Sequence, residues 1–169
     1  MKKGFIALAI ILWILFLGCL GAVFYLSFQD GEAAKEFGSD IIKSTAKWYY
    51  GTEDIAPDIM LEFTYRFRQI GRILIFTLLG IIGTATIHAT FYRLHWVFRT
   101  LISITLLILV AVFTERYKVY LPTRHFSERE MLYSIYGVLI GFGIVSIITS
   151  IYTFAHYLSG RIANTKVNA

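Results

Sequence analysis

Four long apolar stretches divide this chain, and most polar residues lie between them or at its two ends. The stretches cover residues 5–27, 73–92, 97–114 and 131–157. Each is close to the roughly 20 residues that a helix needs to cross the hydrocarbon core of a bilayer. Backbone amides inside lipid must pair within their own segment, so each stretch is predicted to be a helix. The pattern therefore predicts an all-α integral membrane four-helix bundle.

The composition agrees with a membrane protein. Hydrophobic residues make up 57% of the chain and charged residues 16%, whereas soluble domains are roughly 45–50% apolar. The first apolar stretch exceeds the roughly 7–15 residues of a signal-peptide core, so an uncleaved anchor is expected. A single cysteine, Cys19, excludes an internal disulfide. The net charge is +5, but the basic residues form no stripe or known motif, so no nucleic-acid partner is expected.

The charges are divided between the two sides of the predicted bundle. All eleven Asp and Glu residues fall in an outer segment, 28–72, or an outer loop, 115–130. The positive-inside rule then places both termini in the cytoplasm. We expect one domain over residues 1–158 and a disordered cytoplasmic tail over 159–169. The basic residues on the inner side are Lys2, Lys3, Arg93, Arg99, Arg161 and Lys166.

The outer segment is predicted to be helical as well. An amphipathic helix is expected from Asp30, a suitable N-cap, to Gly51. It lies either on the outer leaflet or against the outer end of the bundle. Pro57 suits the first turn of the next helix, which runs without a break into the second span. The residues of the amphipathic helix at helical spacing are Phe37, Ile41, Ile42, Thr45, Trp48 and Tyr49.

The outer loop carries charges at the depth where the third span ends. Glu115 follows a fully apolar run, so its carboxylate needs a cation nearby. Arg72 is the first candidate and Arg124 the second, while Arg68 lies one turn from Arg72 on the same helix side. Two interpretations follow. The charges either fasten the loop over the helix ends, or they form a cationic pocket for a lipid phosphate or a carboxylate.

Small residues in the last span favour close helix packing. Gly137 and Gly141 form a Gly-x-x-x-Gly pattern, which lets another helix approach closely. That helix belongs either to the same bundle, with Gly80 and Gly83 as counterparts, or to a membrane-protein partner.

The histidines predict no metal site. His88, His95 and His156 fall on the inner side and His125 on the outer side, so no three converge with a carboxylate. His88 is instead expected to be an interior residue that hydrogen-bonds to Thr84 or Thr86.

Three elements resemble the VanZ family of small bacterial membrane proteins. Residues 27–32, SFQDGE, are similar to its Ser-Ser-Gln-x-Gly-Glu element. Residues 68–80, RQIGRILIFTLLG, follow its Arg-Lys-x-Ala-His-Phe-x-x-Tyr-x-x-Leu-Gly element. Residues 114–141 follow its Asp-Glu-x-His-Gln-x-Phe-x-Pro-Gly-Arg element, which precedes an Asp and a Gly-x-x-x-Gly helix. The matching positions in this third element are Glu115, Pro122, Arg124, Glu130, Gly137 and Gly141.

Several ionisable positions depart from the family pattern. Where the family has Asp, His, Gln, Gly, Lys and His, this chain has Thr114, Tyr117, Lys118, Thr123, Gln69 and Arg72. Glu115 and Glu130 could form an acid–base pair, but the missing Asp and His would be the most suitable proton carriers. We therefore expect no catalytic residues, no enzymatic activity and no cofactor.

The resemblance implies a bacterial plasma-membrane protein linked to glycopeptide resistance of the teicoplanin type. The implied partners are membrane lipids and a lipid-anchored cell-wall precursor or lipoglycopeptide, bound at the outer face. The alternative is a structural or assembly subunit of a membrane complex, docking through the Gly137 face or the outer amphipathic helix. The residues expected to bind the ligand are Gln29, Arg68, Arg72, Glu115, Arg124 and Glu130.

Overall fold

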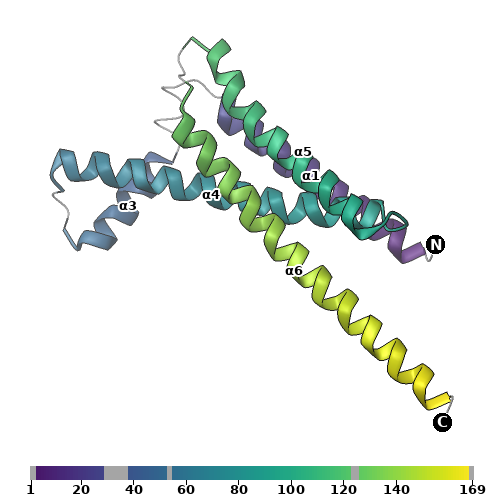
Figure 1. The fold of residues 1–169 in the computed structure, drawn as a ribbon. Coiled ribbons are helices and arrows are strands. Elements are labelled where there is room, and N and C mark those ends of the chain that lie inside the picture. The colour runs from purple at the N-terminus through teal and green to yellow at the C-terminus, as the bar shows by residue number, and fades with distance from the viewer. Residues whose placement is uncertain (1–2, 29–37, 53–54, 123–125, 168–169) are drawn as a thin grey trace.

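Helices account for nearly all of the structure. The computed structural model describes residues 3–28, 38–52, 55–122 and 126–167. Within these residues there is no strand, so the predicted all-α class is confirmed (Figure 1). The elements are α1 (Lys3–Phe28), α3 (Ser39–Tyr50), α4 (Pro57–Thr90), α5 (Trp96–Arg116), the 3-10 turn η1 (Tyr117–Tyr120) and α6 (Glu128–Val167).

Four segments are long and apolar enough to cross a membrane. They are Ile6–Phe28, Pro57–Thr90, Trp96–Tyr120 and Glu128–Ala155. Each overlaps one of the predicted spans, so the chain is a multi-pass membrane protein. The helix α4 has 34 residues with Pro57 in its first turn, which corresponds to about 50 Å. Because the hydrocarbon core is about 30 Å thick, α4 extends beyond it, as the sequence predicted.

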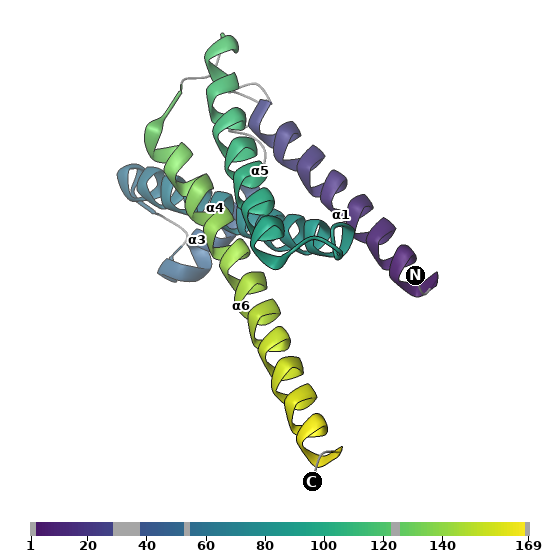
Figure 2. The ribbon, with the colours of Figure 1, turned by 45° about the vertical axis from the view of Figure 1, so that its right-hand side comes forward.

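The two ends of the bundle differ in their connections. At the hairpin end, residues 91–95 join α4 to α5, and the Trp13 indole of α1 donates a hydrogen bond to the Thr90 hydroxyl over 3.0 Å. At the opposite end, here called the ion-pair end, α5 stops and α6 begins. The ring of Phe28, at the end of α1, lies 4.7 Å from the ring of Tyr117 there. The helices α1 and α5 therefore run side by side in the same direction, from the hairpin end to the ion-pair end (Figure 2).

The helix α4 is the centre of the packing. It contacts α1, α3, α5 and α6 and crosses the first half of α6 (Figure 1). One apolar core joins the four long helices. Its fully buried members are Phe16, Val23, Phe76, Leu79, Leu107, Ala111 and Val138.

Glycines make the crossing of α4 and α6 possible. A Cβ atom on Gly137 would lie 2.6 Å from the Ile73 carbonyl oxygen, and one on Gly80 would lie 2.7 Å from the Val138 carbonyl oxygen. A Cβ on Gly141 would meet the backbone of Thr77. The helix backbones are thus close enough that any side chain at these positions would push them apart.

The glycine contact is made within the chain. Gly80 is the predicted counterpart of Gly141, with its own added Cβ 3.2 Å from the Gly141 Cα atom. The prediction was wrong for Gly83, whose added Cβ would meet Leu107 and Phe16. Gly83 lies one turn further along α4, where the neighbours are α5 and α1. Since Gly137 and Gly141 face α4, a protein partner would have to bind another surface.

The helix α3 packs on α4 through a narrow face. Ile42 and Ala46 are buried, and Tyr50 lies against Phe63 of α4, with ring centroids 5.9 Å apart. Trp48 stays 83% exposed, so α3 both contacts the bundle and presents an apolar side outward. Gly51 ends α3 in the left-handed conformation (φ 68°) and donates its N–H to the Lys47 carbonyl, as predicted. The predicted N-cap, Asp30, lies outside the described residues.

The last helix is longer than predicted. The chain was expected to be disordered from residue 159, but α6 continues to Val167. Extending an existing helix by one residue needs no new nucleus, whereas starting one is costly. A polar sequence after a stable apolar span is therefore not sufficient to end the helix.

We predict that Gly141→Ala destabilises the protein by about 1–3 kcal/mol, because the added methyl group overpacks the contact with α4. Thermal unfolding of the purified protein in detergent would measure the change. Gly143→Ala is the matched control, since an added Cβ there meets no atom within 4 Å. The control should be neutral or gain up to about 1 kcal/mol from helix propensity. Equal effects of the two substitutions would contradict the close packing of α4 and α6.

Candidate functional site

Four charged side chains meet at the ion-pair end. Arg72 of α4 binds Glu115 of α5 over 2.9 Å and Glu130 of α6 over 2.6 Å. Lys118 of η1 binds the same two carboxylates, Glu115 over 2.7 Å and Glu130 over 2.9 Å. Each cation thus has two carboxylates and each carboxylate has two cations. These four residues are called the ion-pair cluster.

The ion-pair cluster is shielded from solvent to different degrees. The side chains of Glu115 and Lys118 are only 2% and 3% exposed, while Arg72 and Glu130 are 22% and 27% exposed. Charges in such a place are costly unless they are paired and hydrogen-bonded. Because all four are paired in this way, the cluster fastens three long helices together at one point.

Local backbone structure positions the cluster. The 3-10 turn η1 continues the end of α5, so Lys118 lies three residues after Glu115 and on the same side. At the start of α6, the Ser127 N–H donates to Glu115 Oε1 over 3.3 Å. The Glu130 N–H lies 3.4 Å from the Ser127 hydroxyl, which accepts from it like a helix cap. The loop between α5 and α6 therefore hydrogen-bonds to Glu115, the carboxylate that Arg72 and Lys118 also bind.

The predicted pair of Arg72 and Glu115 is confirmed. The prediction missed Lys118, which appeared only as a departure from the family pattern. Its spacing of three residues from Glu115 was the available signal, because such pairs face each other on a helix. Gln29 and Arg124, two other predicted site residues, lie outside the described residues.

A cavity of about 590 Å³ opens beside the cluster. Its walls come from α1, α3 and α4, and Arg72, Lys118 and Glu130 line one part of it. Arg68, the remaining predicted site residue, also lies on this wall. Most of the other lining side chains are apolar, among them Leu26 and Ile75. The space, here called the α1–α3–α4 cavity, therefore combines an apolar interior with a charged border.

One polar atom on the cavity wall has no partner. The side chain of Gln69 is 8% exposed, and its Oε1 atom is buried without a hydrogen bond. A buried amide oxygen that remains unpaired is unfavourable. Gln69 thus offers an acceptor for a hydroxyl or amide N–H group entering the cavity.

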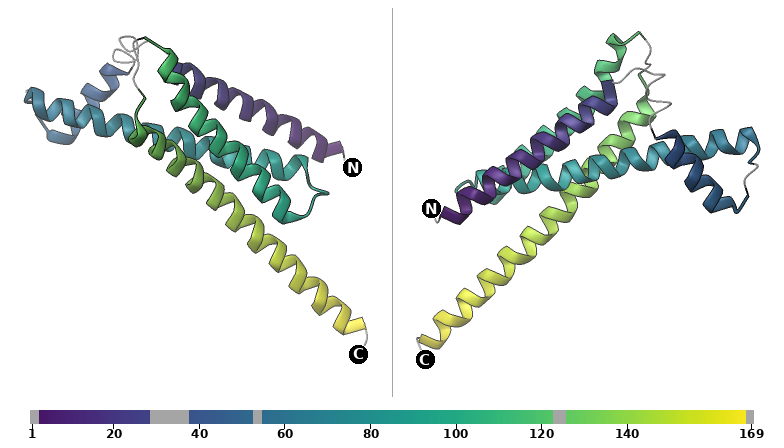
Figure 3. Two further views of the ribbon diagram at one scale, coloured as in Figure 1. Left: turned by 45° about the horizontal axis from the view of Figure 1, so that its top comes forward. Right: turned by 180° about the vertical axis from the view of Figure 1, so that it is seen from behind.

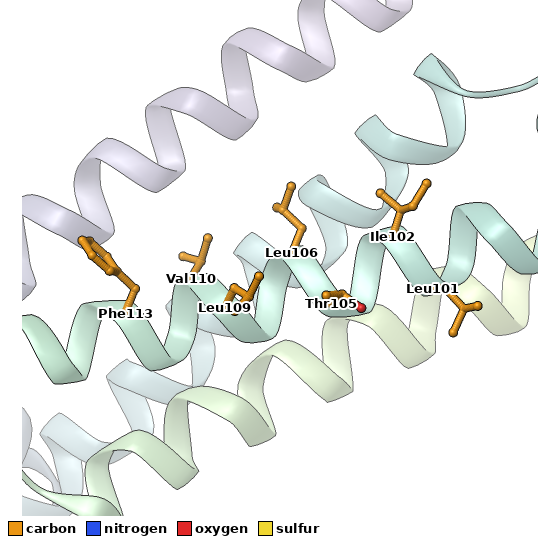
Figure 4. A pocket seen from close by; sticks show the side chains of 7 residues that line it. All are labelled: Leu101, Ile102, Thr105, Leu106, Leu109, Val110 and Phe113. Carbon is orange, nitrogen blue, oxygen red and sulfur yellow. The ribbon is translucent and has the colours of Figure 1, made fainter.

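A second hollow, of about 680 Å³, lies along α5. Figure 4 shows its seven lining side chains on α5, beside α1. They include Leu106 and Phe113, and the only polar one is Thr105. A groove without charged groups and with one hydroxyl suits acyl chains of the bilayer rather than a headgroup.

The described part of the chain contains no set of side chains that could bind a metal ion. No three His, Cys, Asp or Glu side chains there are grouped so that they could hold a metal ion. The two carboxylates closest to such a role, Glu115 and Glu130, are occupied by Arg72 and Lys118.

We predict that Lys118→Met lowers the free energy of unfolding by about 3–5 kcal/mol, because it leaves buried Glu115 short of one cation. The matched control is Arg66→Met, which breaks an exposed pair on α4, Arg66 with Glu62, at 73% and 65% exposure. It should cost only about 0–1 kcal/mol. Thermal unfolding in detergent measures both. A similar small loss for Lys118→Met would mean that the cluster does not hold the helices.

Comparison with protein-family models, with curated proteins and with solved structures finds no match to this chain. The resemblance to the VanZ family stays a prediction from the three sequence elements.

Proposed function

We propose that this is a non-catalytic, VanZ-like protein of a bacterial plasma membrane that binds a lipid-type amphiphile at its extracytoplasmic face. The α1–α3–α4 cavity is the observation that carries the proposal. Its volume of about 590 Å³ lies within the range of roughly 300–1,000 Å³ usual for ligand pockets. An apolar interior with a few convergent polar groups is also the usual composition of such pockets.

The charges at the cavity favour an anionic headgroup. The lining residues include three cations, Arg68, Arg72 and Lys118, and one carboxylate, Glu130. Glu115 behind them brings the balance of these five residues to three positive and two negative charges, an excess of one positive charge. Arginine binds phosphate and carboxylate oxygens with two parallel hydrogen bonds. The Gln69 oxygen adds an acceptor for a hydroxyl or amide N–H near the headgroup.

The ion-pair cluster and the ligand site have separate tasks in this proposal. Arg72 and Lys118 already hold two carboxylates each, which supports the interpretation that the cluster fastens the helices. Gln69, whose Oε1 atom has no partner, is then a residue of the cavity wall that meets the ligand. Pairing of Glu115 and Glu130 with cations also supports a protein without acid–base catalysis.

The resemblance to the VanZ family supplies the biological setting. It implies a role in glycopeptide resistance of the teicoplanin type. Both implied ligands combine apolar and charged groups, as the cavity lining does. A lipoglycopeptide has an acyl tail and charged groups, and a cell-wall precursor has a lipid anchor and phosphates. By occupying the cavity, either one would be held at the outer surface, which changes access of the drug to its target.

For the alternative function, assembly of a membrane complex, one of the two predicted docking surfaces remains available. The exposed side of α3, with Ile41 and Trp48, is available, whereas Gly137 and Gly141 are used against α4. Co-purification in mild detergent separates the two functions. A stoichiometric protein partner would support assembly, and a retained lipid would support binding.

We predict that Gly71→Leu weakens ligand binding at least tenfold, or about 1.4 kcal/mol, by filling the cavity. Gly71 lines the cavity, and an added Cβ there meets no atom within 4 Å, so the fold should tolerate the change. Gly21→Leu is the control, because Gly21 is equally open but lies on α1 outside the cavity lining. Binding of a lipoglycopeptide and of a lipid-linked precursor to the purified protein is measured separately. Teicoplanin susceptibility of cells is measured in parallel.

The expected result is loss of binding and of any resistance with Gly71→Leu alone. If the Gly71→Leu protein binds both ligands as tightly as the unchanged protein, the α1–α3–α4 cavity is not the ligand site.

The orientation is tested independently. Reporter domains fused to the two ends of the chain should both be active in the cytoplasm, because four spans return the chain to its starting side. Reporters on opposite sides, or both outside, would place the cavity on the wrong face for a drug or a cell-wall precursor.

A further inference from the structure

The hairpin end contains buried polar atoms that have no hydrogen-bond partner. On α4 these are the Thr84 hydroxyl and both ring nitrogens of His88. On α5 they are the Trp96 indole nitrogen and the Arg99 Nε atom. The predicted hydrogen bond between His88 and Thr84 or Thr86 is therefore wrong. Thr86 instead donates to the carbonyl oxygens of Ile82 and Leu12.

These side chains come from neighbouring turns of two packed helices. Thr84 and His88 are four residues apart on α4, and Trp96 and Arg99 are three apart on α5, so each pair shares one helix side. Arg99 Nη1 lies 3.5 Å from the His88 carbonyl oxygen, which it donates to at the limit of a hydrogen bond. The short connection between α4 and α5 brings the two turns together (Figure 3). The four residues are called the hairpin-end cluster.

Other hydroxyl groups nearby are satisfied within their own helices. Thr90 donates to the Thr86 carbonyl, Thr100 to the Trp96 carbonyl and Ser103 to the Arg99 carbonyl, each over 2.8 or 2.9 Å. The hairpin-end cluster thus contains most of the buried side-chain polar atoms that lack a partner in the described residues, the others being on Gln69 and Ser146. Buried polar atoms that lack a protein partner indicate a bound water, ion or ligand.

The hairpin-end cluster carries the cation Arg99, and its neighbours in the sequence include no Asp or Glu. Every Asp and Glu of the chain lies in residues 28–72 or 115–130, outside the stretch that contains the cluster. None of the described ion pairs includes Arg99. A guanidinium group at the edge of a membrane span needs an anion. That anion therefore comes from outside the chain.

The donor set selects the kind of anion. The Trp96 indole N–H, the Arg99 Nε–H, the Thr84 hydroxyl and one N–H of His88 are all donors without a partner among the described residues. Phosphate oxygens accept several such bonds at once, and arginine binds them in a planar fork. Trp96 and Arg99 are only partly buried, so an anion at the surface can reach them. The first turn of α5 lies at the boundary of the span, which is the depth of lipid headgroups.

We infer that the hairpin-end cluster binds the phosphate group of an anionic phospholipid from the leaflet on that side. The partly exposed Trp96 and Arg99 meet the phosphate, whereas His88 and Thr84, at 8% and 0% exposure, belong to the buried part of the cluster. The site lies at the opposite end of the bundle from the α1–α3–α4 cavity. It does not depend on the function proposed for that cavity.

The test is thermal unfolding of the purified, delipidated full chain with added phosphatidylglycerol, phosphatidylcholine or inorganic phosphate. Phosphatidylglycerol should raise the midpoint temperature of unfolding by several degrees, since a ligand that binds only the folded state stabilises that state. Phosphatidylcholine and inorganic phosphate should have little effect. No shift with phosphatidylglycerol, or an equal shift with inorganic phosphate, would overturn the assignment of a lipid.

Substitutions locate the site. Arg99→Gln should weaken phosphatidylglycerol binding at least tenfold, because it removes the charged fork. Trp96→Phe keeps an aromatic ring but removes one N–H donor, so it tests the hairpin-end cluster even if Arg99→Gln fails to fold. It should weaken binding by a smaller factor. Arg93→Gln is the matched control, because Arg93 is an exposed cation at the same end and hydrogen-bonds to Tyr92. Equal losses with Arg93→Gln and Arg99→Gln, or none with Arg99→Gln and Trp96→Phe, would exclude the hairpin-end cluster as the site.

Discussion

Four buried charges hold the ion-pair end together. Arg72, Glu115, Lys118 and Glu130 come from three long helices and one 3-10 turn, and each has two partners of opposite charge. Apolar helix surfaces in lipid do not by themselves favour contact with one particular helix, because lipid tails are equally apolar. A closed set of ion pairs does give that preference. The relative positions of α4, α5 and α6 follow from it.

The second constraint is the close contact of α4 and α6. Glycines at this crossing bring the two backbones together, and the cluster lies only a few residues away on the same helices. The glycine contact sets the distance between α4 and α6, and the ion-pair cluster sets their register along each other. Together they leave the other side of α4 to α1 and α3, where the cavity forms.

The two ends of the bundle use polar groups in opposite ways. The ion-pair end satisfies the four charges of the ion-pair cluster within the chain. The hairpin end has cations and unpaired hydrogen-bond donors, and no ion pair is found there among the described residues. One end is therefore closed by the protein itself, and the other is complete only with an anion from its surroundings. The asymmetry of charge along the sequence becomes an asymmetry of binding chemistry across the membrane.

The sequence by itself determined the helical class, the four spans, the unbroken helix from Pro57 and the pairing of Arg72 with Glu115. These follow from local periodicity and from the cost of an unpaired carboxylate beside lipid. Only the tertiary structure decided that Lys118 completes the cluster, that Gly83 faces α1 and α5, and that His88 lacks a partner. Such features depend on which helix faces are opposed and at what rotation. Apolar spans of similar composition do not encode this locally, because any of their faces is equally soluble in lipid.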